Sequence, residues 1–157
     1  MKKIIVFLSY DKNTKLLYIE SLFFLAWARV LKSLPFNIVA PLLGKQMQET
    51  TYDPNNSTEK IVKHISQAVL ITSNYTFWES QCLVQAVAAM KMLNRRKIES
   101  TLYLGTAKDE KGKLIAHAWL RSGPYYLTGS EGMEKFTVVG YFAKVFNGNI
   151  QGVPYEK

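Results

Sequence analysis

The fold is decided by the segment Ser80–Trp119, which reads SQCLVQAVAAMKMLNRRK (residues 80–97) and then IESTLYLGTAKDEKGKLIAHAW (residues 98–119). Its first part is rich in alanine, and its apolar residues recur at helical spacing, which predicts an amphipathic helix from Cys82 to about Arg96. Strand-forming residues lie on both sides of the polar turn 108–113, which predicts an antiparallel hairpin. Cys82, the only cysteine, is therefore expected at the start of a helix, and His117 on a strand.

Helical patterns precede this segment and strand patterns follow it. Leu16–Leu34 is an apolar helical stretch that Pro35 ends, because a proline ring blocks the continuation of a helix. A short apolar connection, 36–43, leads to a polar turn and then to a second helix that starts at Asn56 or Ser57. Further strands are expected at 125–128 and 136–142. These elements predict an α+β fold, in which N-terminal helices precede the Cys82 helix and that helix packs on a small antiparallel sheet.

At 157 residues the chain fits a single domain, 1–157, that can bury a core without disulfides. Within it we expect a helical support region (1–73), a core (74–146) and a loose tail (147–157). One cysteine excludes an intramolecular disulfide, and together with only two histidines it excludes the common zinc frameworks. An unpaired thiol favours the reducing cytoplasm.

The net charge of +8 comes from basic residues that are scattered along the chain, so nucleic-acid binding is not expected. Leu16–Leu34 is a poor membrane span because Glu20, Arg29 and Lys32 interrupt it. We expect it to be an aromatic-rich helix buried in the core or against a partner. The alternative is a helix that lies on a membrane surface, helped by the flanking lysines.

Cys82 and His117 are the candidate reactive groups. The free N–H groups and the dipole of a helix N-terminus favour a thiolate, and the same N–H groups can stabilise an oxyanion. Each residue also has a simpler interpretation: Cys82 as a small buried apolar residue, and His117 as a core histidine packed by Trp119. Strand alternation places His117 on one face with Trp119, whereas the two flanking alanines point the other way and suit a close helix–sheet contact.

Several stretches together resemble the stand-alone leader peptidases of lasso-peptide biosynthesis, which belong to the transglutaminase-like cysteine peptidase superfamily. They are ESLFFLAWARVLKSLPFNIVAPLLG (20–44), the Cys82 helix, AHAWLR (116–121), GPYYLTGSEG (123–132) and FTVV (136–139). The resemblance covers nearly the whole chain, and its most specific element is the combination of Cys-Leu with Ala-His-Ala-Trp at this spacing. It implies a papain/transglutaminase-like fold.

The resemblance also implies a function. The chain would be a cytoplasmic, bacterial cysteine endopeptidase that cuts the leader from a ribosomally made precursor peptide, without metal or other cofactor. Cys82 would be the nucleophile, and His117 would be its general base and later its acid. A separate small protein would capture the leader, and an ATP-dependent macrolactam cyclase would use the freed amine.

One part of the family pattern is missing. The family places an aspartate about a dozen residues after the histidine, whereas positions 128–130 here are Thr, Gly and Ser. Glu131 is the nearest acid and is the candidate orienting residue; Thr128, or a backbone carbonyl, is the alternative acceptor for the Nδ1–H of His117. Supporting roles are expected for Gln81 and Trp78 near the oxyanion, and for Trp119 beside the histidine.

Two other functions fit the same residues. The first is a transglutaminase-like acyl transferase or amidase that uses the same Cys82–His117 pair on another substrate. The second is a catalytically lapsed scaffold for precursor processing, which the missing aspartate favours.

Overall fold

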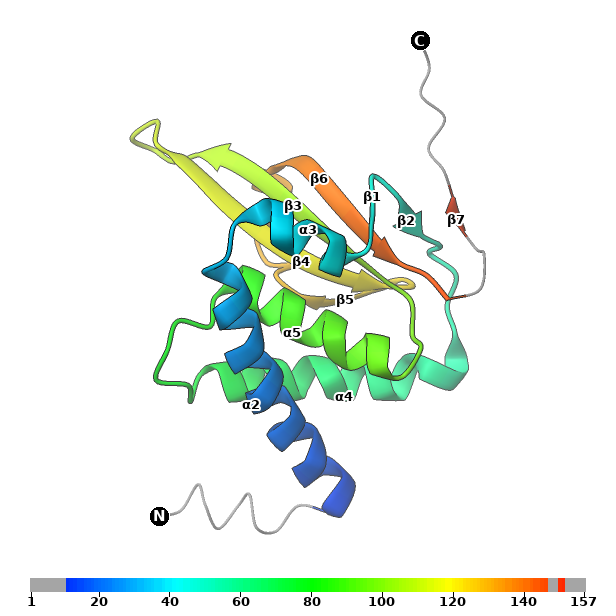
Figure 1. Ribbon diagram of the computed structural model, residues 1–157. Coiled ribbons are helices and arrows are strands. Elements are labelled where there is room, and N and C mark those ends of the chain that lie inside the picture. Colours follow the sequence, from blue (N-terminus) through cyan, green and yellow to red (C-terminus); the bar gives the residue numbers. More distant parts are fainter. Residues whose placement is uncertain (1–10, 147–149, 152–157) are drawn as a thin grey trace.

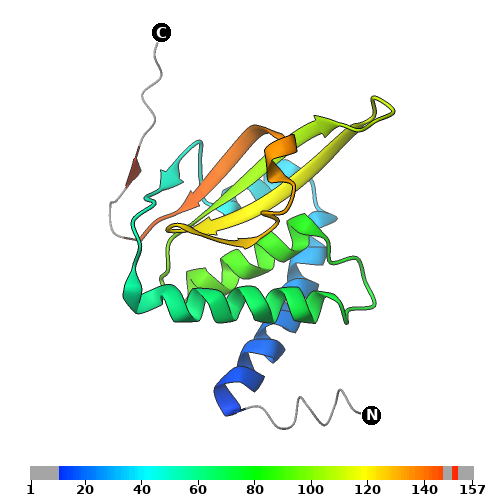
Figure 2. The same ribbon diagram turned by 180° about the vertical axis from the view of Figure 1, so that it is seen from behind.

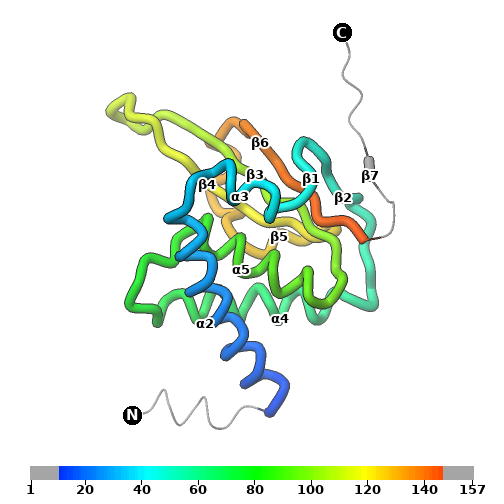
Figure 3. The backbone as a smooth tube through the Cα atoms, in the orientation of Figure 1, coloured from blue at the N-terminus to red at the C-terminus, as the bar shows by residue number. Residues whose placement is uncertain are grey.

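The structure is a computed structural model, and it describes residues 11–146 together with the backbone of Ile150 and Gln151. Apart from these two residues, the predicted loose tail 147–157 lies outside the described residues, as does the segment 1–10. Figure 1 shows the arrangement of the elements, and Figure 3 follows the path of the chain through them.

Helices fill most of the first two thirds of the described chain. Asp11 caps the first of them, because its carboxylate accepts hydrogen bonds from the N–H groups of Asn13 and Thr14. Asn55 caps another in the same way through the N–H of Ser57. The helices are α2 (Lys12–Lys32), α3 (Phe36–Leu43), α4 (Asn56–Ser73) and α5 (Cys82–Arg95).

The strands form a five-stranded antiparallel sheet in the order β1-β6-β3-β4-β5. A second, two-stranded ladder pairs β2 with β7. The strands are β1 (Lys45–Gln46), β2 (Glu49–Thr50), β3 (Ser100–Lys108), β4 (Leu114–Ser122), β5 (Tyr125–Thr128), β6 (Thr137–Lys144) and β7 (Ile150–Gln151), and a short 3₁₀ helix, η1 (Met133–Lys135), precedes β6. The predicted α+β fold is confirmed.

The helices α4 and α5 lie against the sheet, and α2 crosses them on the outside (Figure 1). A bidentate ion pair joins α2 to the end of α5, since the Glu20 carboxylate accepts hydrogen bonds from Arg96 at 2.6 and 2.9 Å. The core lies between the helices and one face of the sheet. Its fully buried members include Leu25, Ile65, Val69, Met90, Leu93, Leu102 and Leu120.

The other face of the sheet carries a separate aromatic and cationic layer. Because side chains alternate along a strand, His117, Trp119 and Arg121 point away from the face on which Ala118 and Leu120 enter the helical core. The Trp119 ring stacks on Tyr103, with centroids 5.6 Å apart. The predicted split between His117 and its flanking alanines is thus present.

Arg121 is the centre of this second layer and is fully buried. Its guanidinium stacks on the Tyr52 ring at 3.5 Å. It donates hydrogen bonds to the carbonyls of Thr50, Thr51 and Gly123 and to the Tyr103 hydroxyl. The arginine therefore fastens the segment 50–52 to the sheet.

The sequence prediction of the elements was wrong in two places. The apolar connection 36–43 is the helix α3, with Pro41 inside it, and the polar segment that follows holds β1 and β2. In α4, Val62, Ile65, Ala68 and Val69 are buried, whereas Ile61 is only half-buried.

The helix α2 buries one side and exposes an apolar stripe on the other. Leu17, Phe24, Leu25, Ala28 and Leu31 are buried, whereas Leu16, Ile19, Leu22, Phe23 and Val30 are exposed. Among the described residues, no helix has the length and apolar character needed to cross a membrane.

Candidate active site

Cys82 is the first residue of α5, as predicted, and it packs in a half-buried position against the helical core. The preceding residue, Gln81, is the N-cap in an extended conformation, and its side chain makes no capping hydrogen bond. The first N–H groups of a helix have no intrahelical partner. Those of α5 receive no side-chain cap from Gln81, and N–H groups at a helix N-terminus can bind an anion.

The segment before Cys82 is held by hydrogen bonds. Thr76 Oγ1 lies 2.8 Å from Ser80 Oγ and 3.0 Å from the Ser73 carbonyl oxygen. Gln85, one turn after Cys82, donates through its amide to Ser73 Oγ at 3.1 Å and to the Ser80 carbonyl at 2.9 Å. These contacts tie the end of α4 to the start of α5 and fix the backbone that delivers Cys82.

An ion pair also fixes this segment from outside. Lys32, at the end of α2, lies 2.5 Å from the Glu79 carboxylate. The hydrogen bond from Lys32 holds the pKa of Glu79 below its ordinary value.

His117 lies on the outer face of the sheet, in the layer that contains Trp119. Its ring is 5.8 Å from the Trp119 ring and 4.9 Å from the ring of Phe136, which follows η1. Figure 2 shows η1 (orange) in front of the strands, with α2 (blue) behind the helices α4 and α5. The imidazole is thus enclosed between β4 and the segment that leads into β6.

The Nε2 atom of His117 lies 2.7 Å from the Gly129 carbonyl oxygen. A carbonyl oxygen only accepts hydrogen bonds, so Nε2 must carry the proton. In the neutral ring Nδ1 then holds the lone pair and is the nitrogen that can accept a proton.

The structure brings Cys82 and His117 to the same end of the sheet but not into contact. The N-terminus of α5 lies toward the end from which the β3–β4 hairpin projects (Figures 1 and 2). The thiol lies on the helical side, whereas the imidazole lies on the other side. Within residues 11–146, no hydrogen bond joins the two side chains.

The orienting contact of His117 comes from the backbone. Glu131 is exposed, and Thr128 is buried with its Oγ1 lacking a partner among the described residues. The Gly129 carbonyl lies between these two residues in the sequence. It accepts the hydrogen bond of Nε2, whereas a backbone carbonyl was expected to bind Nδ1–H. The glycine between Thr128 and Ser130 was the available sequence signal, although a residue type does not reveal which way a carbonyl points.

The three supporting residues lie in different surroundings. Gln81 is exposed. The Trp78 indole packs against the helical core, and its Nε1 is buried with no partner among the described residues. Trp119 belongs to the outer layer through its stacking on Tyr103, so it neighbours His117 and not Cys82.

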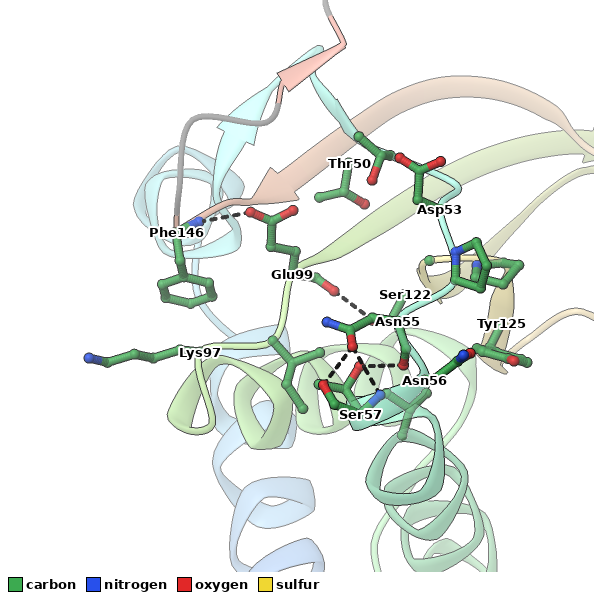
Figure 4. A pocket seen from close by; sticks show the side chains of 17 residues that line it. Thr50, Asp53, Asn55, Asn56, Ser57, Lys97, Glu99, Ser122, Tyr125 and Phe146 are labelled. Atoms are coloured by element: carbon green, nitrogen blue, oxygen red, sulfur yellow. Dashed lines mark hydrogen bonds between the residues drawn. The ribbon is translucent and has the colours of Figure 1, made fainter.

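A polar cleft of about 570 Å³ lies elsewhere, near the start of α4 and the residues that follow α5 (Figure 4). Internal hydrogen bonds already use much of its lining: Asn55 Oδ1 accepts from Ser57, and Ser122 Oγ donates to the Glu99 carbonyl at 2.6 Å. Since Cys82 begins α5 and this cleft adjoins its C-terminal end, the cleft is separate from the thiol.

Comparison with known proteins gives one match. A family model described as the transglutaminase-like superfamily matches residues 24–140, a span that includes both Cys82 and His117. Neither the curated proteins nor the solved structures returned a match.

Proposed function

The chain belongs to the transglutaminase-like superfamily, and from this premise we propose that it is a cysteine peptidase that removes the leader from a ribosomally made lasso-peptide precursor. The superfamily includes cysteine peptidases and acyl transferases. The specific substrate is inferred from the sequence resemblance described above. The proposed place of action is the cytoplasm, where the thiol stays reduced.

The observation that carries the proposal is the position of Cys82 at the uncapped start of α5. Its backbone surroundings are fixed by the Thr76, Ser80 and Gln85 hydrogen bonds. Because no side chain caps the first turn, its N–H groups are available to the negative charge of a thiolate and of the oxyanion that forms from the substrate carbonyl.

The proposed reaction has two stages. The Cys82 thiolate attacks the carbonyl carbon of the leader–core peptide bond, and the resulting oxyanion collapses to a thioester as the amine leaves. His117 takes the thiol proton in the first stage and delivers it to the leaving amine. Water then attacks the thioester, which releases the leader carboxylate and restores the thiol.

His117 has to change its partner to take this role. Its Nε2–H is bonded to Gly129 on the outer face, and Gly129 packs closely against Ala118 and Trp119 of β4. This bond must break, and the segment at Gly129 must move, before the imidazole can serve Cys82. Catalytic hydrogen bonds often form only when substrate is bound, and the proposal assigns this rearrangement to peptide binding.

The proposed partners follow from the same role. A separate small protein would present the leader to this chain, and an ATP-dependent cyclase would use the amine that cleavage releases. The net charge of +8 suits a carboxylate-bearing precursor or carrier.

The test is cleavage of a precursor peptide, presented with its leader-binding protein and followed by mass spectrometry. Cys82→Ala and His117→Ala should each reduce cleavage at least ~10³-fold, as expected for loss of a nucleophile or its base, with unchanged circular dichroism. His64→Ala is the matched control, because His64 is the other histidine and lies exposed on α4; it should retain full activity. Cleavage by a folded Cys82→Ala protein would contradict the proposal, and a product with an added amine would indicate acyl transfer instead.

A scaffold without catalysis is the second candidate, and the Nε2–Gly129 hydrogen bond favours it because that bond holds His117 away from Cys82. Alkylation of Cys82 by iodoacetamide at neutral pH, compared with that of glutathione, separates the two functions. The nucleophile of a peptidase should react faster than glutathione. The cysteine of a scaffold should react no faster.

A further inference from the structure

Phe77 is the most exposed large apolar residue in the described part of the chain, with 96% of its surface accessible. Its ring makes an edge-to-face contact with Trp78, with centroids 4.6 Å apart. Trp78 itself is anchored in the helical core. The Trp78 ring, which is fixed in the core, therefore supports the exposed Phe77 ring.

The exposure of Phe77 belongs to a braced segment. Thr76 on one side is bonded to Ser73 and Ser80, and Glu79 on the other side is paired with Lys32. A backbone fixed at both sides presents the phenylalanine in one place, which is the arrangement that lowers the entropic cost of binding a ligand.

Other apolar side chains adjoin the same segment. Leu70 and Ile71, in the last turn of α4, are also exposed. They precede Ser73, which Gln85 ties to the first turns of α5. We define the apolar lip as Leu70, Ile71, Phe77 and Trp78; it gathers at the junction where α4 ends and α5 begins.

The lip lies next to the thiol along the chain. Phe77 and Cys82 are five positions apart in the sequence, a length that spans at most about 18 Å even when fully extended. A peptide whose carbonyl meets Cys82 therefore has side chains within a few residues of that bond that can reach the lip. This adjacency identifies the occupant as the peptide on which the thiol acts.

We propose that the apolar lip binds a large apolar side chain of the substrate peptide, on the amino side of the bond that Cys82 attacks. The inference rests on the proposed function, because it assigns substrate selection to residues beside the nucleophile. Phe77 is the specificity-determining residue: its ring supplies the free surface, and Trp78 supports it from behind.

The experiment uses the full chain and two peptide reagents, acetyl-Phe-Gly and acetyl-Ser-Gly chloromethyl ketone. Each alkylates a thiolate, forming an S–C bond as chloride leaves, and intact mass gives the second-order rate at Cys82. Each rate is divided by the rate of the same reagent with glutathione. The Phe reagent should react roughly five- to tenfold faster than the Ser reagent, the effect expected for one aromatic contact.

The variants locate the preference. Phe77→Ala should bring the ratio of the two rates close to one, and Phe77→Leu should restore most of it because leucine remains apolar. Phe23→Ala is the matched control, since Phe23 is an exposed phenylalanine on α2; it should keep the ratio of the wild-type chain.

Iodoacetamide separates failure of this inference from failure of the proposed function. Rapid alkylation of Cys82 by iodoacetamide at neutral pH, together with a Phe:Ser ratio near one, would overturn the apolar lip and leave the nucleophile in place. A ratio that survives Phe77→Ala would also overturn it. A Cys82 that reacts no faster than glutathione with any reagent would overturn the proposed function and the lip with it.

Discussion

At the scale of single residues, Gly129 decides how His117 is held. Its φ is +70°, and a Cβ atom at this position would lie 2.2 Å from the Ala118 carbonyl oxygen. Only glycine allows this approach, and the approach is what brings its carbonyl to Nε2 of His117. The sequence allows Glu131, Thr128 or a backbone carbonyl as the orienting group, and residue types alone do not show which carbonyl faces the imidazole.

Tyr103 gives a prediction at the same scale. Burial raises its pKa above the ordinary value of 10.0, although the nearby Arg121 opposes the shift. The unfolded chain therefore releases this proton at a pH at which the folded chain still holds it, and stability is lost as the pH rises above about 10. Urea unfolding should be measured between about pH 9 and 11. Over this range the free energy of unfolding should fall less steeply in Tyr103→Phe than in the wild-type chain, by up to ~1.4 kcal/mol per pH unit.

The wild-type chain and Tyr103→Phe must be compared by how steeply the free energy of unfolding falls with pH, and not by its value at one pH. Tyr103→Phe also removes the hydroxyl that accepts a hydrogen bond from Arg121 at 3.0 Å, which lowers its stability at every pH. Parallel pH profiles for the two proteins would contradict the prediction.

At the scale of elements, α5 is buried along most of its length, but no side chain caps its N-terminus. Side chains that cap a helix stabilise it by about 1 kcal/mol, yet Gln81 provides no such bond. The missing cap leaves the first-turn N–H groups without a side-chain acceptor. In the proposed function these groups are available to the negative charge that forms at Cys82.

Gln81→Asp tests this element directly. The new carboxylate should accept hydrogen bonds from the first turn and raise the free energy of unfolding by about 0.5–2 kcal/mol. It should also slow the alkylation of Cys82 by iodoacetamide, because it occupies the N–H groups and repels a thiolate. Gln81→Ser is the neutral control and should slow alkylation less; faster alkylation in Gln81→Asp would contradict the account.

Long elements were predictable from sequence, and short ones were not. The α4 and α5 helices, the hairpin of β3 and β4, and β5 follow from periodicity and from turn residues such as Lys111-Gly112. The strands β1 and β2 have two residues each, too few for a period, and they exist only through pairing with distant strands. The helix α3 was missed because Pro35 before it and Pro41 inside it indicate a connection.

The candidate site was predictable only in part. The place of Cys82 follows from the helical pattern alone. Strand alternation predicts that His117 and its neighbouring alanines lie on opposite faces. The distance between Cys82 and His117, however, depends on how the helix packs on the sheet. The enclosing contact with Phe136 depends on the course of residues 129–136, which no local pattern specifies.

At the scale of the whole molecule, Arg121 joins the outer layer to the sheet. Its hydrogen bonds to Thr50, Thr51, Gly123 and Tyr103 use the planar fork of the guanidinium. A lysine has neither that fork nor a plane to stack on an aromatic ring. Arg121→Lys should therefore lower the free energy of unfolding by roughly 2–4 kcal/mol, as measured by urea denaturation.

Arg95→Lys is the matched control for this substitution. Arg95 is exposed and pairs with Glu20 on the surface at 3.0 Å, so its replacement should change stability by less than about 1 kcal/mol. Equal losses in the two variants would show that Arg121 does not fasten the segment 50–52.

The Arg121 contacts also bear on how the chain is made. They join residues 70 and 71 positions apart, and Thr101 holds Thr50 across 51 positions. During translation, the segment after α3 therefore has nothing to dock on until the β3–β4 hairpin has emerged from the ribosome. Until then the helices expose the apolar faces that the sheet later covers. Contacts between residues so far apart in the sequence also make folding slow. The newly synthesised chain should therefore depend on chaperones until its last strands arrive.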